Sequence, residues 1–335
     1  MLALAAVLTV FLSYLCVTVL SVLLLTSPFF ALVLCGFAAT RWGLLPLPAI
    51  AGLNSFVLYF ALPCMLYRFG AATPIAQLLD PAVAGVYLAC GLVMVGAVVV
   101  LTHRRQGWND AAFGALVTAF PNTGFMGVPL LVALLGAHSA GPVIVTMAVD
   151  MLVTTSLCIA LSRLGHPGGV WVALRNALKG MAANPMPWAI ALGALASWAQ
   201  WTLPAPVDQT VAMLAGAASP VALFTIGAVL ARSQMNQSER VPARDYVPLA
   251  LAKLLLHPLL VWLGGRAAIA LGVPLSEQAL VVLVLLSALP SASNVVLLTE
   301  RFGAHGGRVA RIILVSTALA FVTFSAAVTW LAPAA

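Results

Sequence analysis

The chain has 335 residues, of which 63% are hydrophobic and only 7% are charged. Soluble domains carry about 25% charged residues, so a chain this apolar cannot cover a water-facing surface and needs lipid as its solvent. The net charge of +7 does not indicate a nucleic-acid partner, because the basic residues stand singly or in small groups between apolar runs. The five cysteines fall inside apolar runs, and neither a CxxC nor an HExxH pair occurs. The sequence therefore predicts no metal site and no cofactor.

Apolar runs long enough to span a bilayer recur along the whole chain, after an ambiguous N-terminus. Residues 2–39 are uncharged, and as one helix they would be about 57 Å long against a hydrocarbon core of about 30 Å. Either this helix kinks at Pro28, or residues 1–17 form a separate N-terminal extension. An all-α integral membrane protein is expected, because helices satisfy their own backbone groups in lipid. The runs and their breakers predict ten transmembrane helices at 18–41, 47–69, 81–102, 110–135, 139–162, 184–203, 207–232, 246–271, 275–300 and 306–332.

The basic residues predict the orientation of these spans. With the N-terminus outside, twelve of the 15 Lys and Arg residues fall on the cytoplasmic side and two on the outer side, while Lys253 lies within a span. Loops on the cytoplasmic side of membranes carry such an excess of Lys and Arg. Both termini are therefore expected outside the plasma membrane.

The chain is expected to contain an internal repeat, with five helices in each of two halves, 18–162 and 184–335. A short cytoplasmic loop at 163–183 joins the halves. Pro121 corresponds to Pro290 in order, and two Pro–Gly spacings recur at a common offset. They are Pro28–Gly36 with Pro185–Gly193, and Pro63–Gly70 with Pro220–Gly227. An odd number of spans in each half forces opposite orientations, which is an architecture of secondary transporters. The alternative is a chance alignment of Pro and Gly.

Two of the predicted spans, the fourth and the ninth, are interrupted. Two prolines and two glycines between Pro121 and Pro129 are incompatible with a regular helix, and 290–294 interrupts the ninth span likewise. In lipid such breaks survive only where protein or an aqueous cavity covers them, and paired breaks mark the binding site of a transporter. The predicted substrate-binding residues are Pro121, Asn122, Thr123, Gly124, Pro290, Ser291, Ser293 and Asn294.

The chemistry of these breaks favours an anion. The half-helices that start near Gly124 and Ser293 each present free N–H groups and a positive dipole end, which suits a carboxylate. Asn122 and Asn294 add side-chain amides as donors or acceptors. The alternative interpretation is a pair of proline kinks plugged by Asn and Ser side chains.

Three ionisable residues inside predicted spans are candidates for ion coupling. Asp150 lies near the middle of the fifth span, and its alternative role is a carboxylate satisfied by Thr or Ser hydroxyls. Lys253 and His257 lie one turn apart on one face of the eighth span. Lys253 could instead extend to the cytoplasmic surface, and His257 could be a neutral hydrogen-bonded histidine.

The crossover segments resemble the auxin efflux carrier family, which includes the plant PIN exporters and bacterial relatives, some associated with malonate. Residues 121–130, Pro-Asn-Thr-Gly-Phe-Met-Gly-Val-Pro-Leu, are similar to the first crossover motif of that family. Residues 288–294 with 300–303 resemble the bacterial form of the second crossover. Asn54–Val57, Ala61–Pro63 and Lys253–Pro258 are further family-like stretches. The resemblance covers about residues 18–332.

The resemblance implies a fold like that of NhaA and the bile-acid symporters. Helices 1, 2, 6 and 7 would form a scaffold, and helices 3–5 and 8–10 a transport domain in which helices 4 and 9 cross. It also implies elevator-type movement, a homodimer and a place in the bacterial inner membrane. The family prolines carry over to Pro121 and Pro290, and its first crossover asparagine to Asn122. Asn294 matches bacterial members and not the plant pattern, so an auxin-specific site is not expected.

The leading function is a secondary active transporter of a small organic anion, a mono- or dicarboxylate such as a malonate-like or auxin-like acid. Proton coupling through Asp150 and His257 is preferred, and a sodium-coupled symporter of the bile-acid type is the alternative. A passive channel is a third possibility. An enzyme is not expected, because the five histidines form no nucleophile–base or metal motif.

Overall fold

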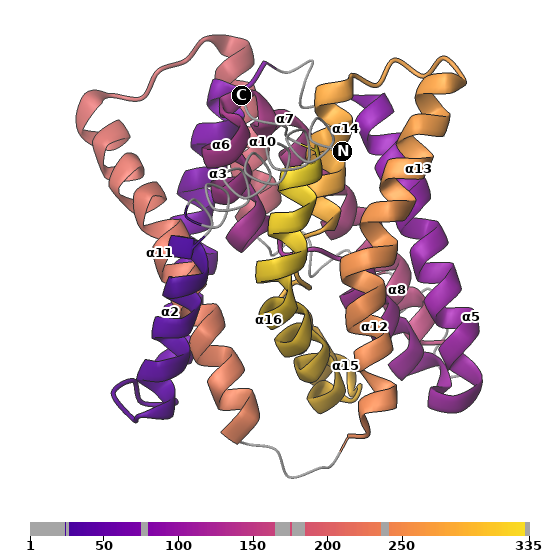
Figure 1. Ribbon diagram of the computed structural model, residues 1–335. Helices are drawn as coiled ribbons and strands as arrows, with labels where there is room; N and C mark the ends of the chain where they lie inside the picture. Colours follow the sequence, from indigo (N-terminus) through magenta and orange to yellow (C-terminus); the bar gives the residue numbers. More distant parts are fainter. Residues whose placement is uncertain are drawn as a thin grey trace, which may run out of the picture.

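The computed structural model describes residues 24, 27–74, 80–164, 175, 185–235 and 241–331. Over these residues the chain is helical, with one isolated β-bridge and no strand (Figure 1). Within them, six helices are long and apolar enough to cross a membrane, and they lie at Ala49–Ala72, Pro81–Ala119, Ala137–Ser162, Ala205–Arg232, Val247–Ala270 and Gly306–Leu331. An integral membrane protein is therefore confirmed. The count of ten spans stays a prediction, and residues 1–17 and nearly all of the loop at 163–183 lie outside the described residues.

The helices occur in the order that the sequence predicts. The first half holds the apolar helix Ser27–Arg41, α2 (Ala49–Phe56), α3 (Leu62–Ala72), α5 (Pro81–Ala119), α6 (Val128–Leu135), α7 (Ala140–Val149) and α8 (Thr155–Ser162). The second half holds α10 (Pro185–Ala199), α11 (Ala205–Met235), α12 (Val247–Leu251), α13 (His257–Ala270), α14 (Glu277–Ser287), α15 (Val295–Phe302) and α16 (Gly306–Leu331). Single π-helical turns join α2 to α3, α7 to α8 and α12 to α13, so each pair forms one long span.

The boundary between the third and fourth predicted spans lies at a kink in the structure. Residues 103–109 separate these two spans in the sequence, and in the structure α5 (Pro81–Ala119) consists of two helices that meet at Gly107, where the backbone is non-helical with φ of +76°. Asp80 begins this helix by accepting hydrogen bonds from the first-turn amides of Ala82 and Val83. The predicted break is therefore confirmed as a kink at Gly107, although the residues on either side of the kink are helical.

Close helix crossings occur at the four glycines that the repeat aligns. A Cβ on Gly36 would lie 1.8 Å from the Phe224 carbonyl oxygen, and one on Gly227 would lie 1.8 Å from that of Val33. A Cβ on Gly193 would lie 2.4 Å from the Tyr67 carbonyl oxygen, next to Gly70. The first helix thus crosses α11 as α10 crosses α3. Small residues let backbones approach in this way in membranes.

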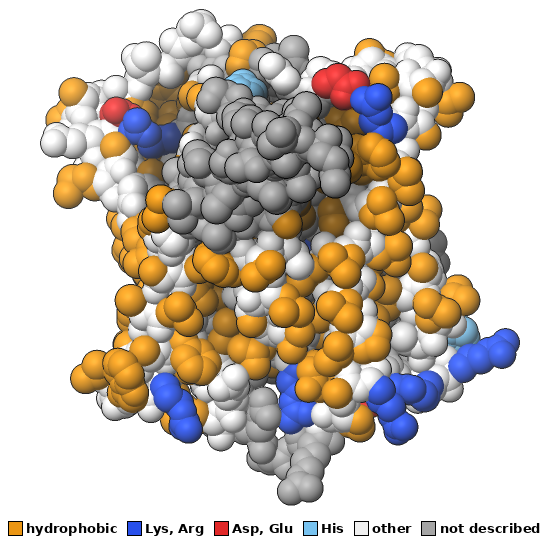
Figure 2. Space-filling model, in the orientation of Figure 1, with side chains coloured by type: hydrophobic (Ala, Val, Ile, Leu, Met, Phe, Trp, Pro, Cys, Tyr) orange, Lys and Arg blue, Asp and Glu red, His pale blue; other side chains and the backbone are white. Residues whose placement is uncertain are grey.

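Charged side chains gather toward the two ends of the molecule, with apolar side chains between them (Figure 2). Arg68 pairs with Asp208 at 3.1 Å, and Arg266 pairs with Glu277 at 2.6 Å. Arg105 pairs with Asp245. This distribution matches a lipid-facing apolar band between two interfacial zones.

We predict that Gly227→Ala lowers the apparent unfolding temperature of the protein in detergent. The added methyl group must displace the backbone of the first helix, and overpacking of this kind costs about 1–3 kcal/mol. The matched control is Gly216→Ala in the same helix, where a Cβ would meet nothing within 4 Å. Because alanine favours helix over glycine, the control should be neutral or stabilising. Equal melting of both variants would contradict the crossing.

Candidate functional site

The two predicted breaks meet and pair with each other through their backbones. Pro121 and Ser291 form an antiparallel bridge. The Asn122 amide donates to the Pro290 carbonyl at 2.8 Å, and the Ala292 amide donates to the Phe120 carbonyl at 3.0 Å. Each break thus satisfies groups that the other would leave exposed to an apolar surrounding. The prediction that protein covers the two breaks is correct for the backbone groups that these hydrogen bonds join.

Three buried polar atoms at this crossing have no hydrogen-bond partner in the structure. They are Asn122 Oδ1, Ser291 Oγ and Asn294 Oδ1. Asn122 is only 3% exposed to solvent, and Ser291 is 1% exposed. Buried polar groups in native proteins are almost always paired with protein, water or a ligand. Unpartnered polar atoms on both breaks are what a binding site for a polar molecule requires.

Helix ends face the crossing from both breaks. A π-helical turn at Thr123–Gly127 leads into α6 and starts directly after Asn122, while α15 starts directly after Asn294. Of the two glycines in this turn, Gly127 is the one against which neighbouring side chains pack closely. A Cβ on Gly127 would lie 2.9 Å from Leu289, whereas one on Gly124 would meet only the Met147 sulfur at 3.6 Å.

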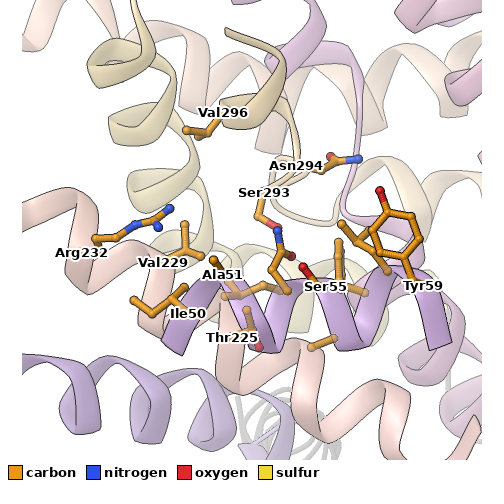
Figure 3. Close-up of a pocket in the computed structure, with 15 residues that line it drawn as sticks. Ile50, Ala51, Ser55, Tyr59, Thr225, Val229, Arg232, Ser293, Asn294 and Val296 are labelled. Carbon is orange, nitrogen blue, oxygen red and sulfur yellow. The ribbon is translucent and has the colours of Figure 1, made fainter. Parts of the chain in front are cut away.

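A cavity of about 280 Å³ lies beside the second break (Figure 3). Of the predicted substrate-binding residues, Ser293 and Asn294 line it. Pro121, Asn122, Thr123, Gly124, Pro290 and Ser291 lie outside its lining. The other walls come from α2 with its π-helical turn, from α11 and from Phe125. Their polar members are Asn54, Ser55, Tyr59, Thr225 and Arg232.

Sequence reasoning missed most of these wall residues. Asn54 and Ser55 belong to a stretch that resembles the family, which was a usable signal, but Tyr59 and Thr225 stand in apolar runs without a motif. Arg232 was counted among the cytoplasmic basic residues. The structure also places it on the cavity wall, near the C-terminal end of α11.

Asp150 sits in a fully formed hydrogen-bond site. The Tyr87 hydroxyl donates to Asp150 Oδ2 at 2.7 Å, and the Thr154 hydroxyl donates to Oδ1 at 3.1 Å. Tyr87 and Asp150 are each 1% exposed. The expected threonine partner is therefore present, together with a tyrosine from α5 that the sequence did not single out. The carboxylate also lies close enough to Lys253 for the two to interact electrostatically.

Lys253 and His257 are both fully buried, so the interpretation of Lys253 as a side chain that extends to the membrane surface is wrong. Lys253 Nζ lies 3.0 Å from His257 Nδ1 and donates to the Ser287 carbonyl at 2.7 Å. Ser287 ends α14, immediately before the second break. Its carbonyl is freed by that break, and a cation there complements the negative end of the helix dipole. The three coupling candidates are thus brought together and joined to the crossing.

Comparison with known proteins gives the family of this chain. Residues 21–328 match the family model described as "Membrane transport protein". The chain belongs to this family. The membership predicted from the two crossover motifs is therefore confirmed. A protein of Rhizobium meliloti (strain 1021) named "Putative malonate transporter" is 29% identical over 310 residues, which are 89% of this chain and 92% of that protein.

Further relatives are also named as transporters. The "Uncharacterized transporter YfdV" of Escherichia coli (strain K12) is 27% identical over 199 residues, which are 58% of this chain and 60% of the relative. An "Uncharacterized transporter" of Methanothermobacter thermautotrophicus is 26% identical over 216 residues, which are 64% of this chain and 67% of that protein. The family and these names make the protein a membrane transporter, and they point away from an enzyme.

Proposed function

We propose that this transporter is a secondary active carrier of a small organic anion, which binds where the two broken helices cross. The observation that carries this proposal is the set of unpartnered buried atoms on both breaks, Asn122 Oδ1, Ser291 Oγ and Asn294 Oδ1, beside a cavity. Binding sites in transporters with inverted repeats lie at such interrupted helices. The Ser291 hydroxyl and the side-chain N–H groups of Asn122 and Asn294 can donate to a carboxylate, while each Oδ1 can accept from a protonated carboxyl group or from water bound with the substrate.

The ends of the half-helices support an anionic substrate. The helical segments that start at Thr123 and Val295 direct their positive dipole ends toward the crossing. The name of the Rhizobium meliloti relative refers to malonate, and a small carboxylate is the ligand class that this chemistry fits.

The proposed architecture is ten helices in two inverted five-helix repeats. It is supported by the matching crossings of the first helix with α11 and of α10 with α3, at glycines that the repeat aligns. The cavity lies between α2 and α11 on one side and the crossing on the other. This is the boundary along which a transport domain would slide against a scaffold in an elevator movement. We extend the proposal to a homodimer in the bacterial inner membrane, with both termini outside.

Replacing the crossover asparagines tests the binding site. We predict that Asn122→Ala and Asn294→Ala each weaken uptake of a small carboxylate such as malonate into proteoliposomes by about tenfold or more. A hydrogen bond to a charged group is worth about 1.5–3 kcal/mol, and 1.4 kcal/mol is a factor of ten. Unchanged apparent unfolding temperatures would show that the variants are folded. Transport equal to that of the parent in both single variants and in the double variant would refute the site.

We further propose that protons drive transport through the buried group formed by Asp150, Lys253 and His257. The group is connected to the substrate crossing by the hydrogen bond from Lys253 to the Ser287 carbonyl. A change of protonation at Asp150 would alter its electrostatic attraction for Lys253. It would thereby change the strength of the hydrogen bond from Lys253 to the Ser287 carbonyl at the end of α14. The alternative is a sodium-coupled symporter.

Imposed ion gradients separate these two mechanisms. We predict that uptake by the parent rises with an inward or outward proton gradient, according to its direction of transport, and is lost with a protonophore. Asp150→Asn keeps nearly the same size but takes up no proton, so it should lose this response and still exchange labelled substrate across the membrane. Uptake that ignores a collapsed proton gradient and requires sodium would exclude proton coupling and favour the symporter.

A further inference from the structure

Arg232 is the one charged side chain among the described residues that line the cavity. It lies near the C-terminal end of α11, is partly buried, and enters the cavity from a different element than Asn294 does (Figure 3). The rest of the polar lining consists of hydroxyls and amides from Asn54, Ser55, Tyr59, Thr225, Ser293 and Asn294. A positive charge thus shares one small space with the second break.

No acidic partner holds Arg232 among the described residues. The ion pairs of that part of the chain use Arg68, Arg105 and Arg266. No carboxylate lines the cavity in the described residues either. A partly buried guanidinium without a counter-charge is costly, and its planar fork of donors matches a carboxylate in two parallel hydrogen bonds.

We propose that Arg232 is the specificity residue that selects dicarboxylates over monocarboxylates, by binding the second carboxylate of a substrate whose first carboxylate lies at the crossing. This inference rests on the proposed function. One carboxylate is held by the helix end and amide at Asn294, and the other by the guanidinium from α11. A monocarboxylate of the same length leaves Arg232 unpaired, and the loss of that charge-assisted pair is the source of discrimination.

The position of Arg232 links dicarboxylate selectivity to one conformational state of the transporter. It belongs to α11, which the proposed mechanism assigns to the scaffold, whereas Asn294 belongs to the moving crossing. Arg232 therefore binds the second carboxylate only when the crossing lies beside the C-terminal end of α11. Dicarboxylate selectivity is a property of the state shown in this structure.

The test compares each dicarboxylate with its own monomethyl ester, using malonate and succinate with monomethyl malonate and monomethyl succinate. Apparent affinities of the full-length protein are measured from the ligand-dependent rise in unfolding temperature. We expect the parent to prefer the diacid, and Arg232→Gln to weaken diacid binding by about tenfold or more. The esters should change by less than about threefold, so the preference collapses. Arg232→Lys, which keeps the charge but not the fork, should fall between the two.

The matched control is Arg41→Gln. Arg41 is exposed, lies outside the cavity lining and belongs to the same predicted cytoplasmic face, so its loss changes the local net charge equally. It should leave diacid preference unchanged. A parent that prefers diacids while Arg232→Gln keeps that preference would overturn the role of Arg232 and leave the carrier proposal standing. A parent that binds neither diacids nor esters would overturn both. An equal loss in Arg41→Gln would assign the effect to general charge.

Discussion

The structure depends on the satisfaction of backbone groups in an environment without water. A helix broken in lipid exposes amides and carbonyls, each of which costs several kcal/mol when unpaired. Here two breaks that are far apart in the sequence satisfy each other's backbone groups. The Asn122 amide donates to the Pro290 carbonyl, and the Ala292 amide donates to the Phe120 carbonyl. This pairing fixes where α6 and α15 begin, and therefore where the dipole ends and crossover asparagines meet. The binding site is a product of the way in which the breaks are stabilised.

The same constraint accounts for the buried lysine. The second break also frees the Ser287 carbonyl at the end of α14, and Lys253 bonds it. A cation in this place needs a counter-charge nearby, and Asp150 supplies an electrostatic partner that Tyr87 and Thr154 hold in position. The second break therefore has an ionisable group bonded to the helix end that precedes it and a cavity beside the residues that follow it. A change of charge at the ionisable group or the binding of a molecule in the cavity would therefore act on the same short segment of backbone.

The sequence predicts the crossing well because Pro and Gly at matching places of two halves leave little freedom. Asp150, Lys253 and His257 are recognisable because an ionisable residue in lipid is costly and needs a reason. Their partners are not recognisable, because Tyr87 and Ser287 become neighbours only when α5, α12, α13 and α14 pack together. The break at residues 103–109 is recognisable from its basic and polar residues, and in the structure it is a kink at Gly107. The place of Arg232 on the cavity wall was not recognisable, because a basic residue at a span end fits the orientation rule equally well whether it faces water or a cavity.

The pairing of Pro121 with Ser291 is tested most directly by a cross-link between them. Residues opposite each other in this type of antiparallel bridge have Cα atoms about 4.5 Å apart, which is within disulfide range. The double variant Pro121→Cys with Ser291→Cys is made after the five native cysteines are replaced by alanine, oxidised in membranes, and digested for mass spectrometry. The account predicts one linked peptide from 121 and 291 within a single chain. Separate alkylation of both cysteines, with no linked peptide, would contradict it.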